Sequence, residues 1–151
     1  MEQKSVFPLP DPFVWIDIPG KGYSIAKYPV TNAQYATFIA AGGYNQRQWW
    51  MDAGWDAKNK GLMLDWSTGT GVETTPWTEP RFWNDSQFDS AEQPVVGVSW
   101  YEALAFCRWL SHTSGNSITL PREDQWQYAA QGDDGRKYPS MNGIVPAAII
   151  P

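Results

Sequence analysis

The chain has 151 residues and a mass of 17.0 kDa, a length that suits one domain with a real core. Hydrophobic residues make up 42% and charged residues 18%, which argues against wholesale disorder. Eleven basic residues against sixteen acidic ones leave a net charge of −5. This acidity argues against a nucleic acid or an anionic membrane surface as the partner.

Cysteine and histidine each occur once, as Cys107 and His112. One cysteine excludes an internal disulfide and an all-cysteine metal site, and one histidine excludes metal sites that need several histidines of this chain. No apolar run reaches the roughly 20 residues of a membrane span, and the first residues contain no apolar signal region. We therefore expect a cytoplasmic protein without membrane contact.

Two short strands are predicted at the start. Residues 13–18 alternate between two faces, with Val14, Ile16 and Ile18 on one of them. A glycine-rich turn at residues 19–22 follows, and residues 23–27 are expected to return as the second strand.

The first helix has clear start and stop signals. Thr31 and Gln34 match a capping box, in which each side chain satisfies a backbone N–H at the helix start. Tyr35 and Phe38 follow at helical spacing, and the glycine pair at 42–43 ends the pattern. The sequence therefore predicts a helix that begins at Asn32.

Residues 44–93 show no sustained period, so we expect a long irregular segment packed around its tryptophans. Six of the ten tryptophans lie between Trp49 and Trp83. Two interpretations stay open for these rings. Either they fill a core made of loops, which we favour for most of them, or a few line a recognition surface.

A second capping box, made by Ser99 and Glu102, predicts a helix from Trp100 to about Ser111. Its apolar side includes Cys107, with Ala103, Leu104 and Leu110 around it.

The last predicted elements are a brief strand at residues 117–120 and a third helix opened by Pro121 and ended by Gly132. Residues 140–151 are uncharged and mostly apolar, and we assign them no element.

Two groups of side chains invite a chemical interpretation. A five-residue separation puts Cys107 and His112 roughly 140° apart around a helix, so we expect Cys107 to be a core residue and not a nucleophile. The acidic clusters Asp85/Asp89/Glu92 and Asp133/Asp134 offer the oxygen ligands that Ca²⁺ prefers, but neither matches an EF-hand loop. Solvated loop carboxylates are the favoured interpretation.

Exposed tryptophans beside carboxylates favour a cationic or sugar-like ligand. If recognition is the function, the candidate ligand-binding residues are Trp49, Trp50, Trp55, Trp83, Asp52 and Asp85, with Trp66, Trp77 and Asp56 as further members of the same rim. We assign no catalytic residue and leave the metal open. The ligand is an unknown protein or small molecule.

Four blocks in a fixed order carry a resemblance to a known family. They are KYPVTNAQY at 27–35, PVVGVSWYEA at 94–103, FCRWL at 106–110 and LPREDQWQYAA at 120–130. From about residue 13 to residue 138 the chain resembles the formylglycine-generating enzyme family, also called the sulfatase-modifying factor domain, and residues 44–88 resemble a bacterial subgroup. The resemblance implies an irregular, loop-rich α+β fold related to C-type lectins.

The resemblance also implies a range of functions. Formylglycine-generating enzymes oxidise a cysteine of a sulfatase motif, with copper bound by two cysteines and O₂ as oxidant. A sister branch uses non-haem iron held by histidines in ergothioneine-type sulfoxide synthesis, and other members only bind ligands or partners.

Three departures from the family pattern bear on this chain. The family domain normally continues well past residue 138, through a segment that carries the catalytic cysteines and has no counterpart here. Cys107 matches a helix cysteine of the family and not a catalytic one. Arg122 stands where threonine is usual, which removes the usual helix N-cap.

We therefore expect an N-terminal extension (1–12), a partial family domain incomplete at its C-terminus (13–138) and an atypical apolar tail (139–151). The expected function is a non-catalytic recognition or accessory module with no cofactor of its own; copper is the family's cofactor, and a structural calcium stays open. The alternative is the N-terminal portion of a copper-dependent oxidase. Self-association is expected where the tail residues Ile144, Ile149 and Ile150 do not cover apolar surface.

Overall fold

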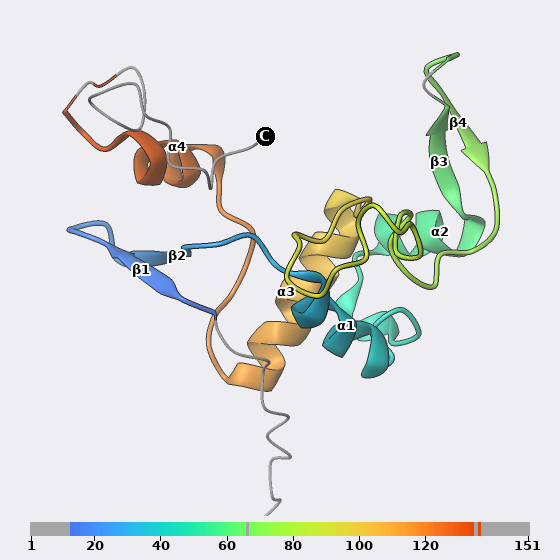
Figure 1. The fold of residues 1–151 in the computed structure, drawn as a ribbon, viewed down its shortest axis with the longest axis horizontal. Helices are drawn as coiled ribbons and strands as arrows, with labels where there is room; N and C mark the ends of the chain where they lie inside the picture. The colour runs from blue at the N-terminus through green and yellow to red at the C-terminus, as the bar shows by residue number, and fades with distance from the viewer. Residues whose placement is uncertain (1–12, 66, 135, 137–151) are drawn as a thin grey trace, which may run out of the picture. The chain divides into compact units, whose positions relative to one another are not determined.

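A computed structural model describes residues 13–65, 67–134 and 136 (Figure 1). They form two compact units: residues 30–120, which we call the aromatic unit, and residues 13–29 with 121–136, which we call the hairpin unit. Helices, two small sheets and long irregular connections make up an α+β fold, as the resemblance implies. The expected tail at 139–151, the extension at 1–12 and Trp66 lie outside the described residues.

The hairpin unit contains two strands and one helix. Strand β1 (Trp15–Ile18) pairs antiparallel with β2 (Tyr23–Ala26), with Trp15 opposite Ala26 and Ile18 opposite Tyr23. The helix α4 (Glu123–Gln131) begins two residues after Pro121 and ends at Gly132. The predicted hairpin and third helix are therefore confirmed, with small shifts of their ends.

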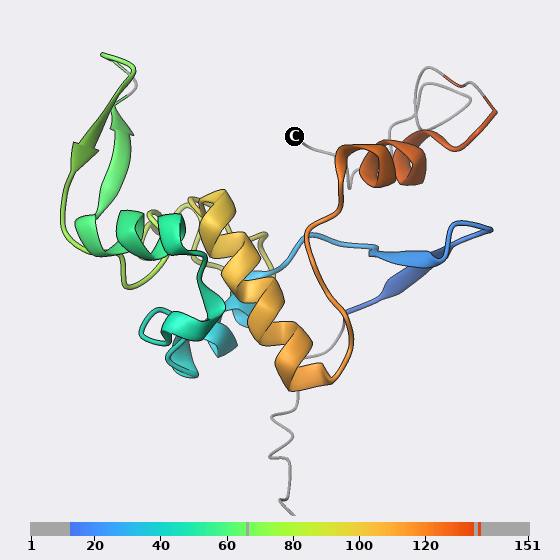
Figure 2. The same ribbon diagram turned by 180° about the vertical axis from the view of Figure 1, so that it is seen from behind.

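The aromatic unit is organised around α1 (Asn32–Ala40) and α3 (Trp100–Ser114), which pack against each other (Figures 1 and 2). Both predicted capping boxes are present. At α1 the Thr31 hydroxyl accepts from the Gln34 N–H at 3.3 Å, while the Gln34 side chain accepts from the Thr31 N–H at 2.9 Å. Local sequence thus determines where each of these helices begins.

The core of the aromatic unit is a cluster of stacked and tilted rings. Tyr35 and Phe106 stack with centroids 5.1 Å apart, and Phe38 meets Phe106 edge-on at 5.9 Å. Phe38 is 0% exposed and Trp109 is 5% exposed. Ring pairs in these arrangements add to the free energy gained by burial.

The prediction that residues 44–93 lack regular elements is wrong. This segment contains a 3₁₀ turn, η1 (Arg47–Trp49), a helix, α2 (Asp52–Lys60), and an antiparallel hairpin of β3 (Leu62–Asp65) with β4 (Thr70–Glu73). The hairpin directly follows α2 in both views (Figures 1 and 2). The remainder of the segment, residues 74–93, is irregular as predicted.

The helix α2 escapes a search for apolar period because its interior glycine replaces a large core side chain. A Cβ at Gly54 would lie 2.8 Å from the Cβ of Tyr101, so only glycine lets α2 approach α3 this closely. The ends of α2 do carry ordinary signals: Asp52 in the first turn, Lys58 and Lys60 in the last, and Gly61 in the left-handed conformation after it.

The strand predicted at residues 117–120 is also wrong. These residues have no ladder partner in the part of the chain that the structure describes, and they connect α3 to α4 without regular structure. The Ser111 hydroxyl holds this connection instead, since it donates to the Ile118 carbonyl and accepts from the Ile118 N–H, both at 2.7 Å. A side chain thus supplies the hydrogen bonds that a neighbouring strand would have provided.

Candidate functional site

Two of the predicted ligand-binding tryptophans belong to the core of the aromatic unit. Trp50 is 2% exposed, and its indole N–H donates to the Gly43 carbonyl at 2.9 Å. Trp49 is 8% exposed and packs its ring 5.3 Å from the ring of His112. The interpretation of these rings as core material fits both positions.

Trp55 is half-buried and has two cations of the chain itself near its ring. The Lys58 ammonium is 4.4 Å from its ring centroid and the Arg47 guanidinium is 5.8 Å away. Arg47 also forms an ion pair with Asp52, the predicted acidic neighbour. Burial lowers the pKa of Lys58, which is 6% exposed. The Trp55 ring therefore has cations of the chain as neighbours, whereas Asp52 pairs with Arg47 at an exposed position.

The remaining predicted residues are separate from this group. Trp83 is half-buried with its ring 6.2 Å from that of Tyr35, and Trp77 is half-buried as well. Asp85 accepts a hydrogen bond from the Gln87 N–H at 2.9 Å. Of the predicted set the structure brings together Trp50 and Trp55, whose rings are 6.4 Å apart.

A buried polar network, which the sequence did not reveal, lies inside the aromatic core. Tyr44 donates its hydroxyl to the Glu102 Oε1 at 2.6 Å, and Glu102 Oε2 accepts from the Ser99 N–H at 2.6 Å. The hydroxyls of Tyr35 and Tyr44 lie 3.3 Å apart. The sequence indicated Glu102 only as a capping residue. Its position on the inner side of α3 is the signal that would have predicted its burial.

Burial controls the ionisation of this network. Burial raises the pKa of Glu102 above its usual range, against the hydrogen bonds from Tyr44 and Ser99, which lower it. Burial, followed by the charge of Glu102, raises the pKa of Tyr35, and burial likewise raises that of Tyr44. Both tyrosines therefore stay protonated and act as donors, so the network fixes the core and offers no base to solvent.

The only cysteine of the chain is a core residue, as predicted. Cys107 is 8% exposed, and burial raises its thiol pKa to about 11. A thiol of this kind is a poor nucleophile, because the thiolate is the reactive form. His112, in the last turn of α3, is exposed. Among the described residues no cluster of three or more acidic, histidine or cysteine side chains has the arrangement of a metal site.

A groove of about 450 Å³ lies in the hairpin unit, between the β1–β2 turn and α4. The Lys21 ammonium lies 4.2 Å from the ring centroid of Tyr128, and the Tyr23 hydroxyl donates to the Gln125 carbonyl at 2.9 Å. Arg122 pairs with Asp124 at 3.0 Å. The groove is thus a polar surface whose charged groups mostly contact one another.

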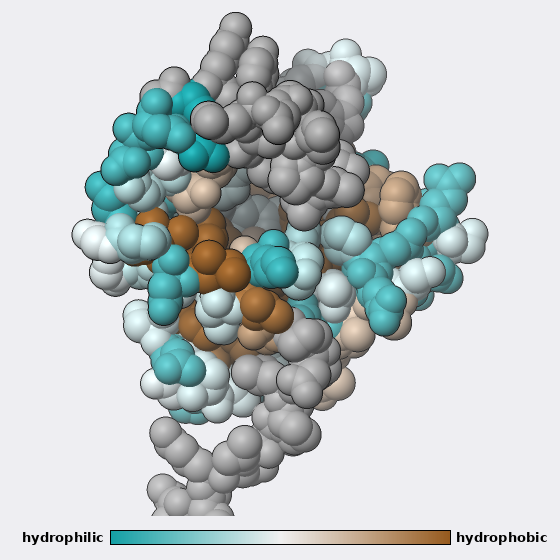
Figure 3. Space-filling model, turned by 60° about the vertical axis from the view of Figure 1, so that its left-hand side comes forward, coloured by the Kyte–Doolittle hydropathy of each residue, from teal (hydrophilic) through white to brown (hydrophobic). Residues whose placement is uncertain are grey.

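Several large apolar side chains remain open on the surface (Figure 3). In the aromatic unit the most exposed ring is Trp100 at 57%, followed by Phe82 at 39% and Phe88 at 37%. None of the three was among the predicted site residues. Phe82 and Phe88 are neighbours, with ring centroids 6.0 Å apart.

Comparison with known proteins gives the class of the chain. Residues 11–149 match the family described as the sulfatase-modifying factor enzyme 1-like domain. The match covers most of the chain, and the chain therefore belongs to this family, as the motif blocks indicated. No helix in the described part of the chain combines the length and apolar character that a membrane crossing requires.

The relatives carry different names. The chain is 31% identical over 147 residues to the hercynine oxygenase of Mycolicibacterium thermoresistibile, covering 89% of this chain and 28% of that protein. It is 31% identical over 137 residues to the formylglycine-generating enzyme of Mycobacterium tuberculosis, covering 78% of this chain and 44% of that protein. It is 29% identical over 142 residues to the inactive C-alpha-formylglycine-generating enzyme 2 of Bos taurus, covering 83% of this chain and 44% of that protein. The chain spans less than half the length of each.

Proposed function

We propose that this chain acts as a non-catalytic recognition or accessory module built on a sulfatase-modifying factor type of domain. The observation that supports the proposal is the state of its single thiol. The copper site implied by the family resemblance needs two cysteines, whereas this chain has one, and Cys107 is buried with its thiol pKa raised to about 11. The relative named as inactive in Bos taurus fits a non-catalytic role within this family.

The direct test is an activity assay on residues 1–151. The chain is incubated with copper, O₂ and a Cys-x-Pro-x-Arg peptide, and mass spectrometry follows the peptide thiol. We expect no aldehyde product, because one buried thiol cannot supply two copper ligands. The formylglycine-generating enzyme of Mycobacterium tuberculosis serves as the positive control. Time-dependent replacement of the thiol mass by the aldehyde mass would refute the proposal.

The second candidate is the N-terminal portion of a copper-dependent oxidase that converts a substrate cysteine to formylglycine. The match to formylglycine-generating enzymes favours it, because most of this chain aligns with 44% of a longer protein of that name. The intact mass of the protein from its natural source separates the candidates. A mass near 17.0 kDa supports the module, and a much larger mass that includes these residues supports the oxidase.

A further inference from the structure

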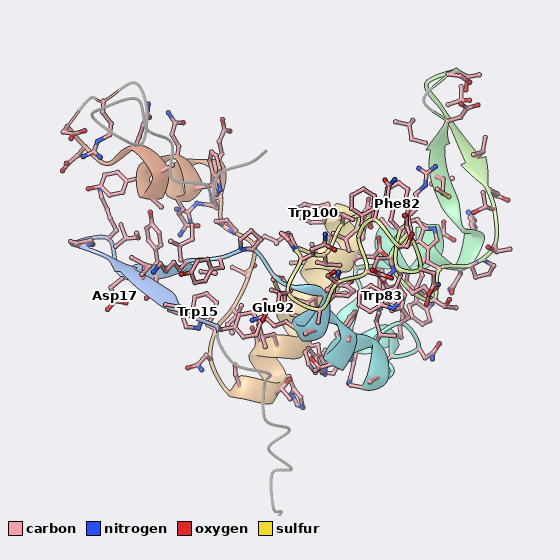
Figure 4. All side chains as sticks on the ribbon, in the orientation of Figure 1. Trp15, Asp17, Phe82, Trp83, Glu92 and Trp100 are labelled. Carbon is pink, nitrogen blue, oxygen red and sulfur yellow. The ribbon has the colours of Figure 1, made fainter. Side chains whose placement is uncertain are left out.

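The polar groove of the hairpin unit has the size of a small-molecule site. Its volume is about 450 Å³, within the roughly 300–1,000 Å³ that is usual for ligand pockets. In Figure 4 the labelled Trp15 and Asp17 mark strand β1, and side chains occupy the region between this hairpin and α4. The side chains that line the groove come from the β1–β2 turn and β2 and from the N-cap and first two turns of α4, and they are Lys21, Tyr23, Arg122, Asp124, Gln125 and Tyr128.

Contacts within the hairpin unit hold the two sides of the groove together. The Tyr23 hydroxyl donates to the Gln125 carbonyl at 2.9 Å, and the Lys21 ammonium lies 4.2 Å from the ring centroid of Tyr128. The Lys21 N–H donates to the Ile18 carbonyl at 3.2 Å, which closes the turn. The groove is therefore formed before any ligand arrives, and this lowers the entropic cost of binding.

The hydrogen-bonding groups that remain available in the groove are mostly donors. Arg122 donates from Nε and Nη2 to the two carboxylate oxygens of Asp124, both at 3.0 Å. Among the described residues no hydrogen bond or ion pair uses the Arg122 Nη1 amino group or the Lys21 ammonium. The Gln125 Oε1 accepts from the Arg122 N–H at 3.0 Å, so its amide N–H groups are also left as donors.

The groove is locally positive although the chain as a whole is acidic. Its lining contains two cations, Lys21 and Arg122, and one carboxylate, Asp124, which Arg122 already neutralises. The Asp133 carboxylate is hydrogen-bonded to the Tyr128 hydroxyl, and Asp133 is not part of the lining. The charge of Lys21 therefore stays uncompensated inside the groove. A surplus of donors and of positive charge suits an oxyanion and disfavours a cation.

We propose that this groove binds the oxyanion group of a small molecule, a phosphate monoester or a carboxylate, with Lys21 and Arg122 as its charged donors. The inference rests on the proposed recognition function and names for it a site and a class of ligand. The two sources of an oxyanion share the same chemistry, and the choice of probes separates them.

The test is a titration of the ¹⁵N-labelled full chain with inorganic phosphate, glucose 6-phosphate or succinate, followed by the amide NMR signals. We expect saturable shifts of the Gly22, Tyr23 and Gln125 amides with at least one of these anions, and none with sodium chloride at matched ionic strength. Tighter binding of the two phosphate probes identifies a phosphate ligand, and tighter binding of succinate identifies a carboxylate. Shifts that only follow ionic strength, or no saturable shift with any of the three anions, would overturn the inference.

Two variants of the lining should change the affinity in opposite directions. Lys21→Met keeps an apolar side chain against Tyr128 but removes the ammonium, and it should weaken binding by about two- to fivefold. Asp124→Asn removes the carboxylate that holds Arg122, and it should tighten binding by a similar factor of about two- to fivefold. A groove that binds anions through these two cations requires both effects.

Each variant has a matched control in the same unit. Lys27→Met removes an ammonium that lies 5.1 Å from the ring centroid of Tyr28, outside the groove, and Asp17→Asn neutralises an exposed carboxylate of β1. We expect both controls to bind like the unmodified chain, and circular dichroism checks that every variant is folded. Equal changes in the controls, or weaker binding in Asp124→Asn, would contradict the site. Aldehyde formation in the activity assay refutes the proposed function instead, so the two failures are distinguishable.

Discussion

The helices α3 and α4 share acidic first turns and glycine ends but differ in what they bury. Both carry a glutamate or aspartate in the first turn and end at a glycine. Helix α3 buries six residues, with Trp109 only 5% exposed, whereas α4 buries none and leaves Trp126 53% exposed. Local signals at the helix ends therefore accompany both helices, while burial depends on which distant segments supply neighbours.

The largest test of this comparison is a matched pair of ring deletions. Phe38→Ala removes a ring that is 0% exposed, contacts Tyr44, Phe106 and Trp109, and should cost about 3–5 kcal/mol of unfolding free energy. Trp126→Ala on α4 should change it by at most about 0.5 kcal/mol. Urea denaturation followed by circular dichroism measures both. Similar losses in the two variants would show that α4 is buried after all.

The next test addresses the polar network that α3 contributes. Glu102→Ala leaves the Tyr44 hydroxyl and the Ser99 N–H without their acceptor inside the core, and should cost about 2–3 kcal/mol. Glu102→Gln retains an acceptor oxygen and should cost less.

The pH dependence of stability in the unmodified chain and in Glu102→Gln tests the burial of Glu102 directly. Burial raises the pKa of Glu102, so the folded state binds this proton more tightly than the unfolded state does. Protonation of Glu102 makes its full contribution to the free energy of unfolding below the pKa of the unfolded state, about 4.3. This contribution is lost as the pH rises through the higher pKa of Glu102 in the folded state. The unmodified chain should therefore lose stability relative to Glu102→Gln as pH increases from 4 toward neutrality. A constant difference across that range would show that Glu102 ionises in the fold as it does in water.

The sequence allowed prediction of those elements whose information is local. The capping residues Thr31 and Ser99, the β1–β2 hairpin and the core position of Cys107 were all identified correctly. The same reasoning missed α2, because its contact with α3 depends on a missing side chain at Gly54 and not on an apolar stripe. It also left open which tryptophans are buried, since composition cannot distinguish a ring packed at 2% exposure, such as Trp50, from one that is open.

Gly54 gives a smaller test of how α2 meets α3. In an isolated helix, Gly→Ala stabilises by about 1 kcal/mol through helix propensity. At Gly54 the added methyl would lie 2.8 Å from the Cβ of Tyr101, so we expect Gly54→Ala to destabilise by about 1–3 kcal/mol. The neighbouring exposed residue is the control, and Ala53→Gly should cost only its propensity, about 1 kcal/mol. A gain in melting temperature for Gly54→Ala would contradict the close approach of the two helices.

The smallest expected effect concerns the N-terminus of α4, where α1 and α3 have a hydroxyl cap and α4 does not. Arg122 occupies the N-cap position, but a guanidinium has no acceptor atom and pairs with Asp124 instead. Only half of a capping box remains, because the Gln125 side chain still accepts from the Arg122 N–H at 3.0 Å. Arg122→Thr restores the missing acceptor and should slow hydrogen exchange of the first α4 amides by about two- to fivefold.

Arg122→Ala is the control for that variant, because it removes the ion pair with Asp124 without adding a cap. An exposed ion pair of this kind contributes little, so exchange in Arg122→Ala should stay close to that of the unmodified chain. Slower exchange in Arg122→Thr alone would show that α4 follows the same capping rule as α1 and α3 although it has no buried face. Equal exchange in both variants would mean that contacts in the hairpin unit, such as Tyr23 with Gln125, hold the start of α4 without a cap.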